Sequence, residues 1–284
     1  MKAEASIRKN RFLNLILVGL PGAGKTKFIL DFPNPVIIDF DYGDLTAQDL
    51  GINIPIIHPT SEDEIRAVIE APEMITEKVI NQIPGFETYE PKTFAFDTIT
   101  TMQDMIMGEG ARASVEISGV TLPARKATGI LSLPSTNRDS GDMPAWGDSH
   151  VFGVRMRKLM LAIKQMPYHT ICSAHLGPSD QLQVSAKPDK KTGMRPKPKA
   201  GYPLLHGQLK WQLGGLTDFY LELEKKGGGF TEYKYIIHTQ QKEAMNTKNR
   251  LTNHLEKNYD WTNKNAFELL DKPLQKAMEE SLKK

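Results

Sequence analysis

The chain is almost without cysteine: its 284 residues include one, Cys172. A single thiol excludes an internal disulfide framework and a cysteine-rich metal site. Cys172 lies in the apolar run 170–174, so we expect a buried core thiol and not a reactive one. The absence of disulfides fits a reducing compartment, and we expect a cytoplasmic protein.

Long hydrophobic runs and excess charge are also missing. No apolar stretch reaches the roughly 18 residues that a membrane-spanning helix needs, so we expect no membrane partner. The first apolar stretch ends at Gly19 without a small-residue cleavage site, which predicts a strand and not a signal peptide. The formal net charge is only +2, so any contact with nucleic acid must be local.

Short apolar runs alternate with helical patterns along the chain. Buried strands are predicted at 13–18, 36–41, 54–58, 93–97 and 169–175. This alternation predicts an α/β fold with a mainly parallel sheet sandwiched by helices.

Later segments follow other patterns. A hairpin with a glycine turn is predicted from 219–224 and 230–239, and it would extend one edge of the sheet in antiparallel fashion. Residues from about 108 to 147 are rich in Gly, Ser, Thr and Pro and predict a long excursion. A helix is predicted from about residue 266 onward.

The strongest motif is a glycine-rich loop between the first predicted strand and the first predicted helix. Residues 19–26 match the pattern G-x-x-x-x-G-K-[ST] in full. The glycines let backbone N–H groups converge on phosphate oxygens, and the helix points its positive end at the same phosphates. Lys25 can reach the β and γ phosphates, and Thr26 can place its hydroxyl on Mg²⁺.

The motif therefore predicts a site for ATP and Mg²⁺; an ordinary glycine-rich turn with a solvated lysine is the alternative. The predicted nucleotide-binding residues are Gly19, Pro21, Gly22, Ala23, Gly24, Lys25, Thr26 and Lys27.

Carboxylates at strand ends are candidates for metal binding and water activation. Asp97 follows an apolar run, as the metal-binding Asp of a P-loop enzyme does; a helix cap is its alternative role. Because Thr98 and not Glu comes next, the group that orients water must lie elsewhere. Asp39 and Asp41 end a strand that a parallel sheet can place next to the first one, and alternate residues share a face. We take Asp41 as the general base or water-positioning group, with Asp44 and a turn-forming role left open.

At this point the chain resembles the RecA core family. In that family the strand after the phosphate-loop helix ends in a pattern like Ile-Asp-x-Glu, whose Glu activates water. This sequence has Ile38-Asp39-Phe40-Asp41 in the same place. The shorter Asp implies a slow ATPase, or one that needs its partner to close the site.

The similarity is strongest to phage-encoded single-domain RecA-like recombinases, which work with single-strand-binding and annealing proteins. Further motifs occur in the family's order: FDTIT at 96–100, WGD at 146–148, SAH at 173–175, DFYL at 218–221 and TKNR at 247–250. The resemblance implies a RecA-like ATPase domain over residues 1–255, a helical tail over 256–284, and a location in the cytoplasm of a phage-infected bacterium.

Roles for three further residues follow from the resemblance. His175 would sense the γ-phosphate, although a core histidine is the alternative. Lys248 and Arg250 would reach into a neighbour's site as an arginine finger does, which requires a ring or filament; a surface pair is the alternative.

A basic loop before the hairpin is the candidate for single-stranded DNA binding. A mobile basic loop can contact phosphates along a single strand, and the RecA core carries a DNA-binding loop at the matching position. A solvated linker is the alternative. Its cationic residues are Lys187, Lys190, Lys191, Arg195, Lys197 and Lys199.

The sequence thus predicts a DNA-dependent RecA-like ATPase that acts on single-stranded DNA in phage recombination or replication. We expect a homo-oligomer, with a single-strand-binding protein as a further partner. A helicase-like ring motor, a small-molecule kinase and a nucleotide-gated assembly factor are the alternatives.

Overall fold

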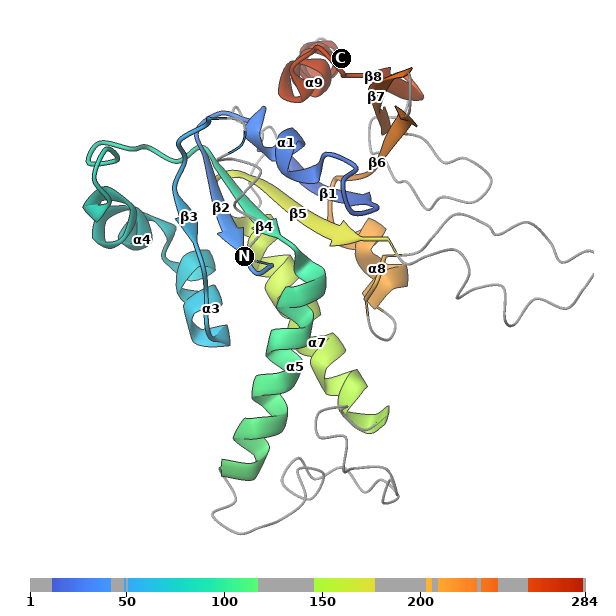
Figure 1. Ribbon diagram of the computed structural model, residues 1–284. Helices are drawn as coiled ribbons and strands as arrows, with labels where there is room; N and C mark the ends of the chain where they lie inside the picture. Colours follow the sequence, from blue (N-terminus) through green and yellow to red (C-terminus); the bar gives the residue numbers. More distant parts are fainter. Residues whose placement is uncertain are drawn as a thin grey trace, which may run out of the picture.

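An eight-stranded sheet is the centre of the protein. The computed structural model describes residues 12–41, 49, 51–116, 146–176, 203–205, 209–228, 231–239 and 255–282. The sheet has the order β3-β2-β4-β5-β1-β6-β7-β8 (Figure 1). Its strands are β1 (Asn14–Gly19), β2 (Pro35–Asp39), β3 (Ile56–Ile57), β4 (Thr93–Asp97), β5 (His169–His175), β6 (Phe219–Gly228), β7 (Thr231–His238) and β8 (Asn258–Asp260).

The first six strands in chain order are parallel, and β7 and β8 continue the sheet in antiparallel fashion. This confirms the predicted α/β fold with a mainly parallel sheet, and the hairpin lies at one edge of the parallel part.

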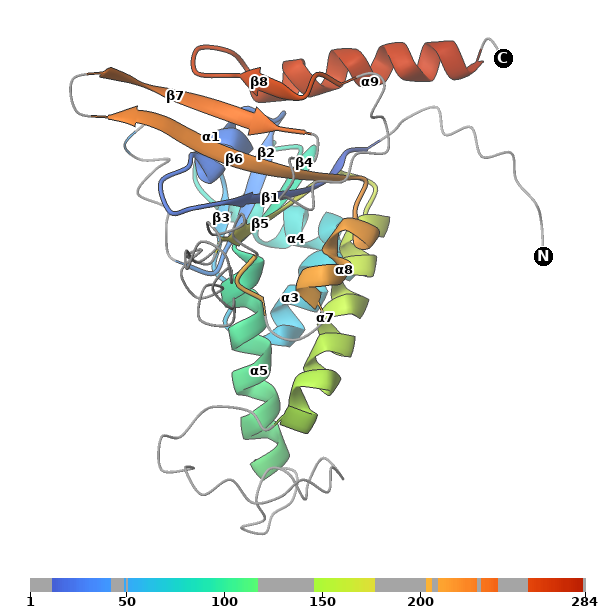
Figure 2. The ribbon, with the colours of Figure 1, turned by 90° about the vertical axis from the view of Figure 1, so that its right-hand side faces the viewer.

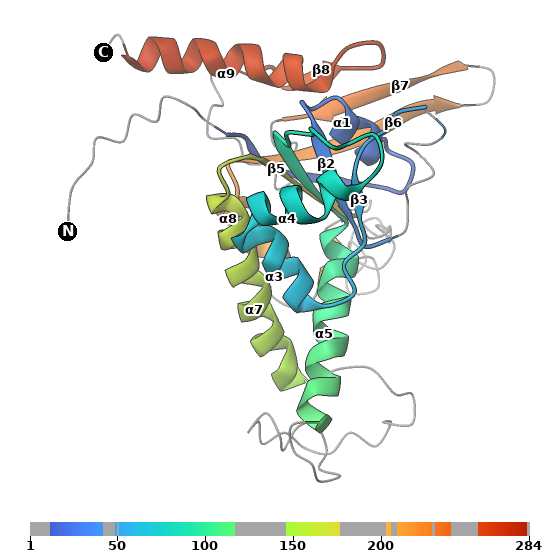
Figure 3. The same ribbon diagram turned by 90° about the vertical axis from the view of Figure 1, so that its left-hand side faces the viewer.

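Helices cover both faces of the sheet. One face carries α3 (Glu62–Glu70), α4 (Pro72–Lys78), α5 (Ile99–Glu116), α7 (Trp146–Gln165) and α8 (Leu209–Leu216). The other face carries α1 (Lys25–Leu30) and α9 (Ala266–Leu282), as Figures 2 and 3 show from two sides. Among the helices in the described part, none has both the length and the apolar character needed to cross a membrane.

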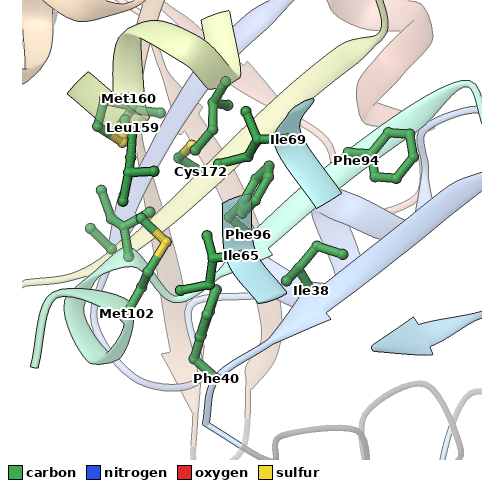
Figure 4. Packing of buried hydrophobic residues seen from close by; sticks show 14 of the residues in the cluster. Ile38, Phe40, Ile65, Ile69, Phe94, Phe96, Met102, Leu159, Met160 and Cys172 are labelled. Carbon is green, nitrogen blue, oxygen red and sulfur yellow. The ribbon is translucent and has the colours of Figure 1, made fainter. Parts of the chain in front are cut away.

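Two hydrophobic cores explain why the strands have continuously apolar sequences. Ile16 and Val18 of β1 face the core beneath α3, α5 and α7, whereas Leu15 and Leu17 face the core beneath α1 and α9. A parallel strand that is buried on both faces cannot alternate apolar and polar residues. Figure 4 shows the first core, where Cys172 is buried as expected; burial raises the pKa of its thiol to about 12.

The strand order differs from one expectation. We predicted that β2 could lie next to β1, but β4 and β5 lie between them. Strand order follows from how the crossover helices pack, and a local sequence pattern does not encode it. Asp39 and Asp41 therefore come from a strand that lies three positions from β1 in the sheet.

The C-terminal segment packs on the phosphate-loop helix. β8 pairs with β7, and the fully buried Trp261 meets the Phe28 ring of α1 edge to face at 5.7 Å. Asp31, just after α1, accepts a hydrogen bond from the Ala266 N–H at 2.8 Å. The boundary predicted after residue 255 falls between β7 and β8, which pair with each other. The segment after this boundary also covers the apolar side of α1.

We expect Trp261→Ala to lower the free energy of unfolding by about 3–5 kcal/mol, because it leaves a large cavity against α1. Urea denaturation followed by circular dichroism measures this change. Lys264→Ala, at an exposed position three residues on, is the matched control and should stay within about 0.5 kcal/mol of wild type. Equal effects of the two substitutions would contradict a structural role for the segment.

Candidate nucleotide-binding site

The phosphate loop leaves β1 at Gly19 and enters α1 at Lys25. Gly22 and Gly24 have φ angles of 75° and 92°, a region that favours glycine. A side chain at Gly24 would also lie 3.0 Å from the Tyr235 ring of β7. Two features therefore disfavour a side chain at position 24: the positive φ angle of the backbone and the Tyr235 ring packed against it.

Lys25 is buried at the centre of the site. Its ammonium group donates to the carbonyl oxygens of Gly19 at 3.2 Å and Leu20 at 3.4 Å, and it lies 3.3 Å from Nδ1 of His175. Burial lowers the pKa of Lys25, while the nearby carboxylates of Asp97 and Asp41 act in the opposite direction.

Thr26 and Asp97 form an oxygen pair beside the loop. The Thr26 hydroxyl donates to Asp97 Oδ2 at 3.1 Å, and the Ser173 hydroxyl donates to Asp97 Oδ1. Burial raises the pKa of Asp97, opposed by the hydrogen bond from Ser173 and the charge of Lys25. No cluster of three or more metal-binding His, Cys, Asp or Glu side chains occurs in the described part of the chain.

This donor set fits Mg²⁺. Magnesium is usually bound through one or two carboxylates together with waters and substrate phosphates, and not by a cage of protein ligands. Asp97 and Thr26, side by side at the phosphate loop, supply such a partial shell.

Asp41 lies against His175. Its Oδ2 atom is 3.0 Å from His175 Nε2 and accepts a hydrogen bond from the Thr98 hydroxyl at 3.2 Å. Burial disfavours the charged carboxylate, but hydrogen bonds from His175, Thr101 and Thr98 outweigh it and lower the pKa of Asp41. Asp41 is therefore ionised at neutral pH, as a group that positions or activates water must be.

His175 contacts both Lys25 and Asp41. It ends β5 and lies opposite Gly19 in the β1–β5 ladder. Because the Lys25 ammonium has only protons to offer, Nδ1 of His175 acts as the acceptor, and Nε2 carries the proton that is donated to Asp41. The structure thus places His175 between the predicted phosphate-binding lysine and the predicted water-positioning carboxylate.

Two predicted residues differ from the rest in their surroundings. The Lys27 ammonium donates to the Thr262 carbonyl at 3.2 Å and lies 4.5 Å from the centre of the Tyr235 ring. Its side chain therefore binds the C-terminal segment. Asp39 is buried at the end of β2, where its carboxylate accepts a hydrogen bond from the Asp41 N–H at 2.9 Å.

The sequence analysis missed Ser173, Thr98 and Tyr235. A signal existed for Ser173, since residues 173 and 175 share one face of a strand. Nothing near Tyr235 in the sequence indicates that its ring meets Gly24, because the contact joins segments more than 200 residues apart.

Several predicted residues lie outside the described residues. They are Asp44, the basic residues Lys187, Lys190, Lys191, Arg195, Lys197 and Lys199, and the pair Lys248 and Arg250. The ends of the basic segment are described: Leu176 pairs with Pro203, and the Leu204 N–H donates to the His175 carbonyl at 2.8 Å. The described residues on either side of the segment 177–202 therefore lie beside His175.

Comparisons with known proteins give a matching family model and similar solved structures. A family model described as AAA domain matches residues 11–251. The flagellar accessory protein FlaH from Methanocaldococcus jannaschii is similar at 12% identity, with 86% of this chain and 83% of that chain covered and a TM-score of 0.33. The KaiC-like protein PH0186 from Pyrococcus horikoshii OT3 is similar at 11% identity, with 84% and 85% covered and a TM-score of 0.36. No curated protein has significant sequence similarity.

The lowered pKa of Asp41 predicts a pH-dependent stability. A carboxyl whose pKa is lower in the folded state stabilises the fold above its ordinary value near 4, and this stabilisation is lost as the pH falls through the folded value. We expect Asp41→Asn to be less stable than wild type at neutral pH, with a difference that shrinks below about pH 4.

Urea unfolding at a series of pH values measures this difference. A difference between wild type and Asp41→Asn that is the same at acid and neutral pH would contradict the prediction.

Proposed function

The chain belongs to the AAA domain family, and from this premise we propose that it is a DNA-dependent, RecA-like ATPase acting on single-stranded DNA in phage recombination or replication. The observation that carries the proposal is the convergence of Lys25, Thr26, Asp97, Asp41 and His175 at the carboxyl ends of the parallel strands. Ligands of open α/β sheets bind at these strand ends.

ATP binding would rearrange the contacts of Lys25. Its ammonium now faces the carbonyl oxygens of Gly19 and Leu20, and it would exchange them for phosphate oxygens, which make stronger charge-assisted bonds. Thr26 and Asp97 would hold Mg²⁺, which neutralises negative charge on the phosphates. Asp41, kept ionised by its hydrogen bonds, would orient the attacking water.

The same exchange would carry a signal from the nucleotide to the basic loop. When Lys25 turns to the phosphates, His175 loses the partner of its Nδ1 atom. The His175 carbonyl is bonded to Leu204, at the far end of the segment 177–202. A shift of His175 would therefore move the base of the loop that is proposed to contact DNA.

A neighbouring subunit would complete the site. Lys248 and Arg250 would stabilise charge in a neighbour's transition state, so the active form is a homo-oligomer. A single-strand-binding protein would supply the DNA.

One observation favours a second candidate, a nucleotide-gated assembly factor with little turnover. The short carboxylate of Asp41 already accepts hydrogen bonds from His175 and Thr98, which restrain its reach toward a water. Such a protein would bind ATP and oligomerise without releasing phosphate.

The proposal predicts ATP hydrolysis that single-stranded DNA stimulates. Lys25→Ala should abolish turnover, because it removes the charge that contacts the β and γ phosphates. Changing Lys190, Lys191, Arg195, Lys197 and Lys199 to Ala should remove the stimulation and leave the basal rate. Phosphate release with and without DNA measures both effects; turnover that is indifferent to DNA would overturn the DNA-dependent assignment.

A shared site predicts complementation between inactive variants. Arg250→Ala should lower kcat by a factor on the order of 10³, as loss of an arginine finger does. Mixing it with Lys25→Ala should restore activity, because some interfaces then combine an intact phosphate loop with an intact finger. A mixture no more active than its separate components would contradict a finger supplied in trans.

A further inference from the structure

A chain of polar contacts crosses the sheet from its edge to the phosphate loop. His58, just after β3, has its Nδ1 atom 3.8 Å from Asp39 Oδ2, and Asp39 Oδ1 accepts the Asp41 N–H at 2.9 Å. Asp41 contacts His175, which contacts Lys25. The proposed mechanism uses the last three residues of this chain and assigns nothing to Asp39.

Asp39 occupies a costly position. It is the last residue of β2, lies opposite Asp97 in the β2–β4 ladder, and is only 4% exposed. A buried carboxylate costs free energy unless polar partners compensate it. The Asp41 N–H is one such partner, bonded to Oδ1, and His58 Nδ1 lies 3.8 Å from Oδ2.

The Asp41 backbone depends on that carboxylate. The Phe40 N–H still bonds to the Asp97 carbonyl on β4, at 2.8 Å. One residue further, the Asp41 N–H donates to the Asp39 side chain in place of a neighbouring strand. This side-chain contact sets the bend after β2 that turns the Asp41 carboxylate toward His175.

We propose that Asp39 is a positioning residue for hydrolysis, whose Oδ1 atom fixes the Asp41 backbone so that the Asp41 carboxylate meets the attacking water. His58, just after the edge strand β3, lies 3.8 Å from the second carboxylate oxygen of Asp39. The inference rests on the proposed function, because it requires Asp41 to orient that water.

Two substitutions with the same branched shape test whether the hydrogen-bond acceptor of Asp39 is what matters. Asp39→Asn and Asp39→Leu both remove the charge, but only Asn keeps an oxygen that can accept the Asp41 N–H. Asp39→Leu should lower kcat by about 10- to 100-fold, since a misplaced group costs rate steeply. Asp39→Asn should stay within about threefold of wild type, and neither should change nucleotide affinity, because Lys25, Thr26 and Asp97 are intact.

The test is a cycle of wild type, Asp39→Leu, Asp41→Asn and the double variant, with kcat and the binding of a fluorescent ATP analogue measured for each. We expect Asp39→Leu to cause no further loss of kcat once Asp41 is Asn. The same loss in both backgrounds would overturn the proposal, as would an equal loss in Asp39→Asn or a parallel loss of nucleotide affinity.

The outcomes distinguish this inference from the proposed function. If Asp41→Asn leaves kcat unchanged, Asp41 does not orient the water, and the role of Asp39 falls with it. If Asp41→Asn removes turnover and Asp39→Leu does not, the inference on Asp39 alone is wrong. Should Asp39→Leu fail to fold, Asp39→Ala in the same cycle replaces it, with the unfolding midpoint as the check.

Discussion

The pairing of β1 with β5 is the contact on which the site depends. It sets Gly19, where the phosphate loop begins, directly opposite His175. Because β5 also pairs with β4, the same strand brings Ser173 to Asp97. Parallel strands end at one edge of a sheet, so this single order of strands brings the phosphate loop and the carboxylates of Asp97 and Asp41 together in one place.

Opposite charges stabilise this cluster of side chains. Lys25 is buried with Asp97 and Asp41 nearby, and the charge of each carboxylate offsets the cost of burying the ammonium. Asp41 gains its low pKa from His175, Thr98 and Thr101, which come from different elements. These groups are therefore already in place in the candidate site, and in the proposed mechanism nucleotide binding would redirect Lys25 without having to assemble the others.

The helix that carries the phosphate loop is short and is stabilised from outside. α1 has six residues, too few for a stable helix alone. Phe28 packs on Trp261, Lys27 bonds to the Thr262 carbonyl, and Asp31 accepts from Ala266. A segment more than 200 residues later in the chain thus holds the loop in its shape. The nucleotide site and the C-terminal segment are one structural unit.

The local features of this protein can be inferred from its sequence. Buried strands, the phosphate loop and the candidate roles of Lys25, Thr26, Asp97 and Asp41 could be predicted from it, because glycine geometry, apolar runs and strand-end carboxylates are properties of neighbouring residues. The role of His175 was predicted from the family resemblance. Only the folded structure reveals the strand order, the packing of Trp261 on α1, the contact of the Tyr235 ring with Gly24, and the hydrogen bond from the Asp41 N–H to Asp39. Contacts between segments far apart in the chain depend on how helices pack on both faces of the sheet, and no short stretch of sequence carries that information.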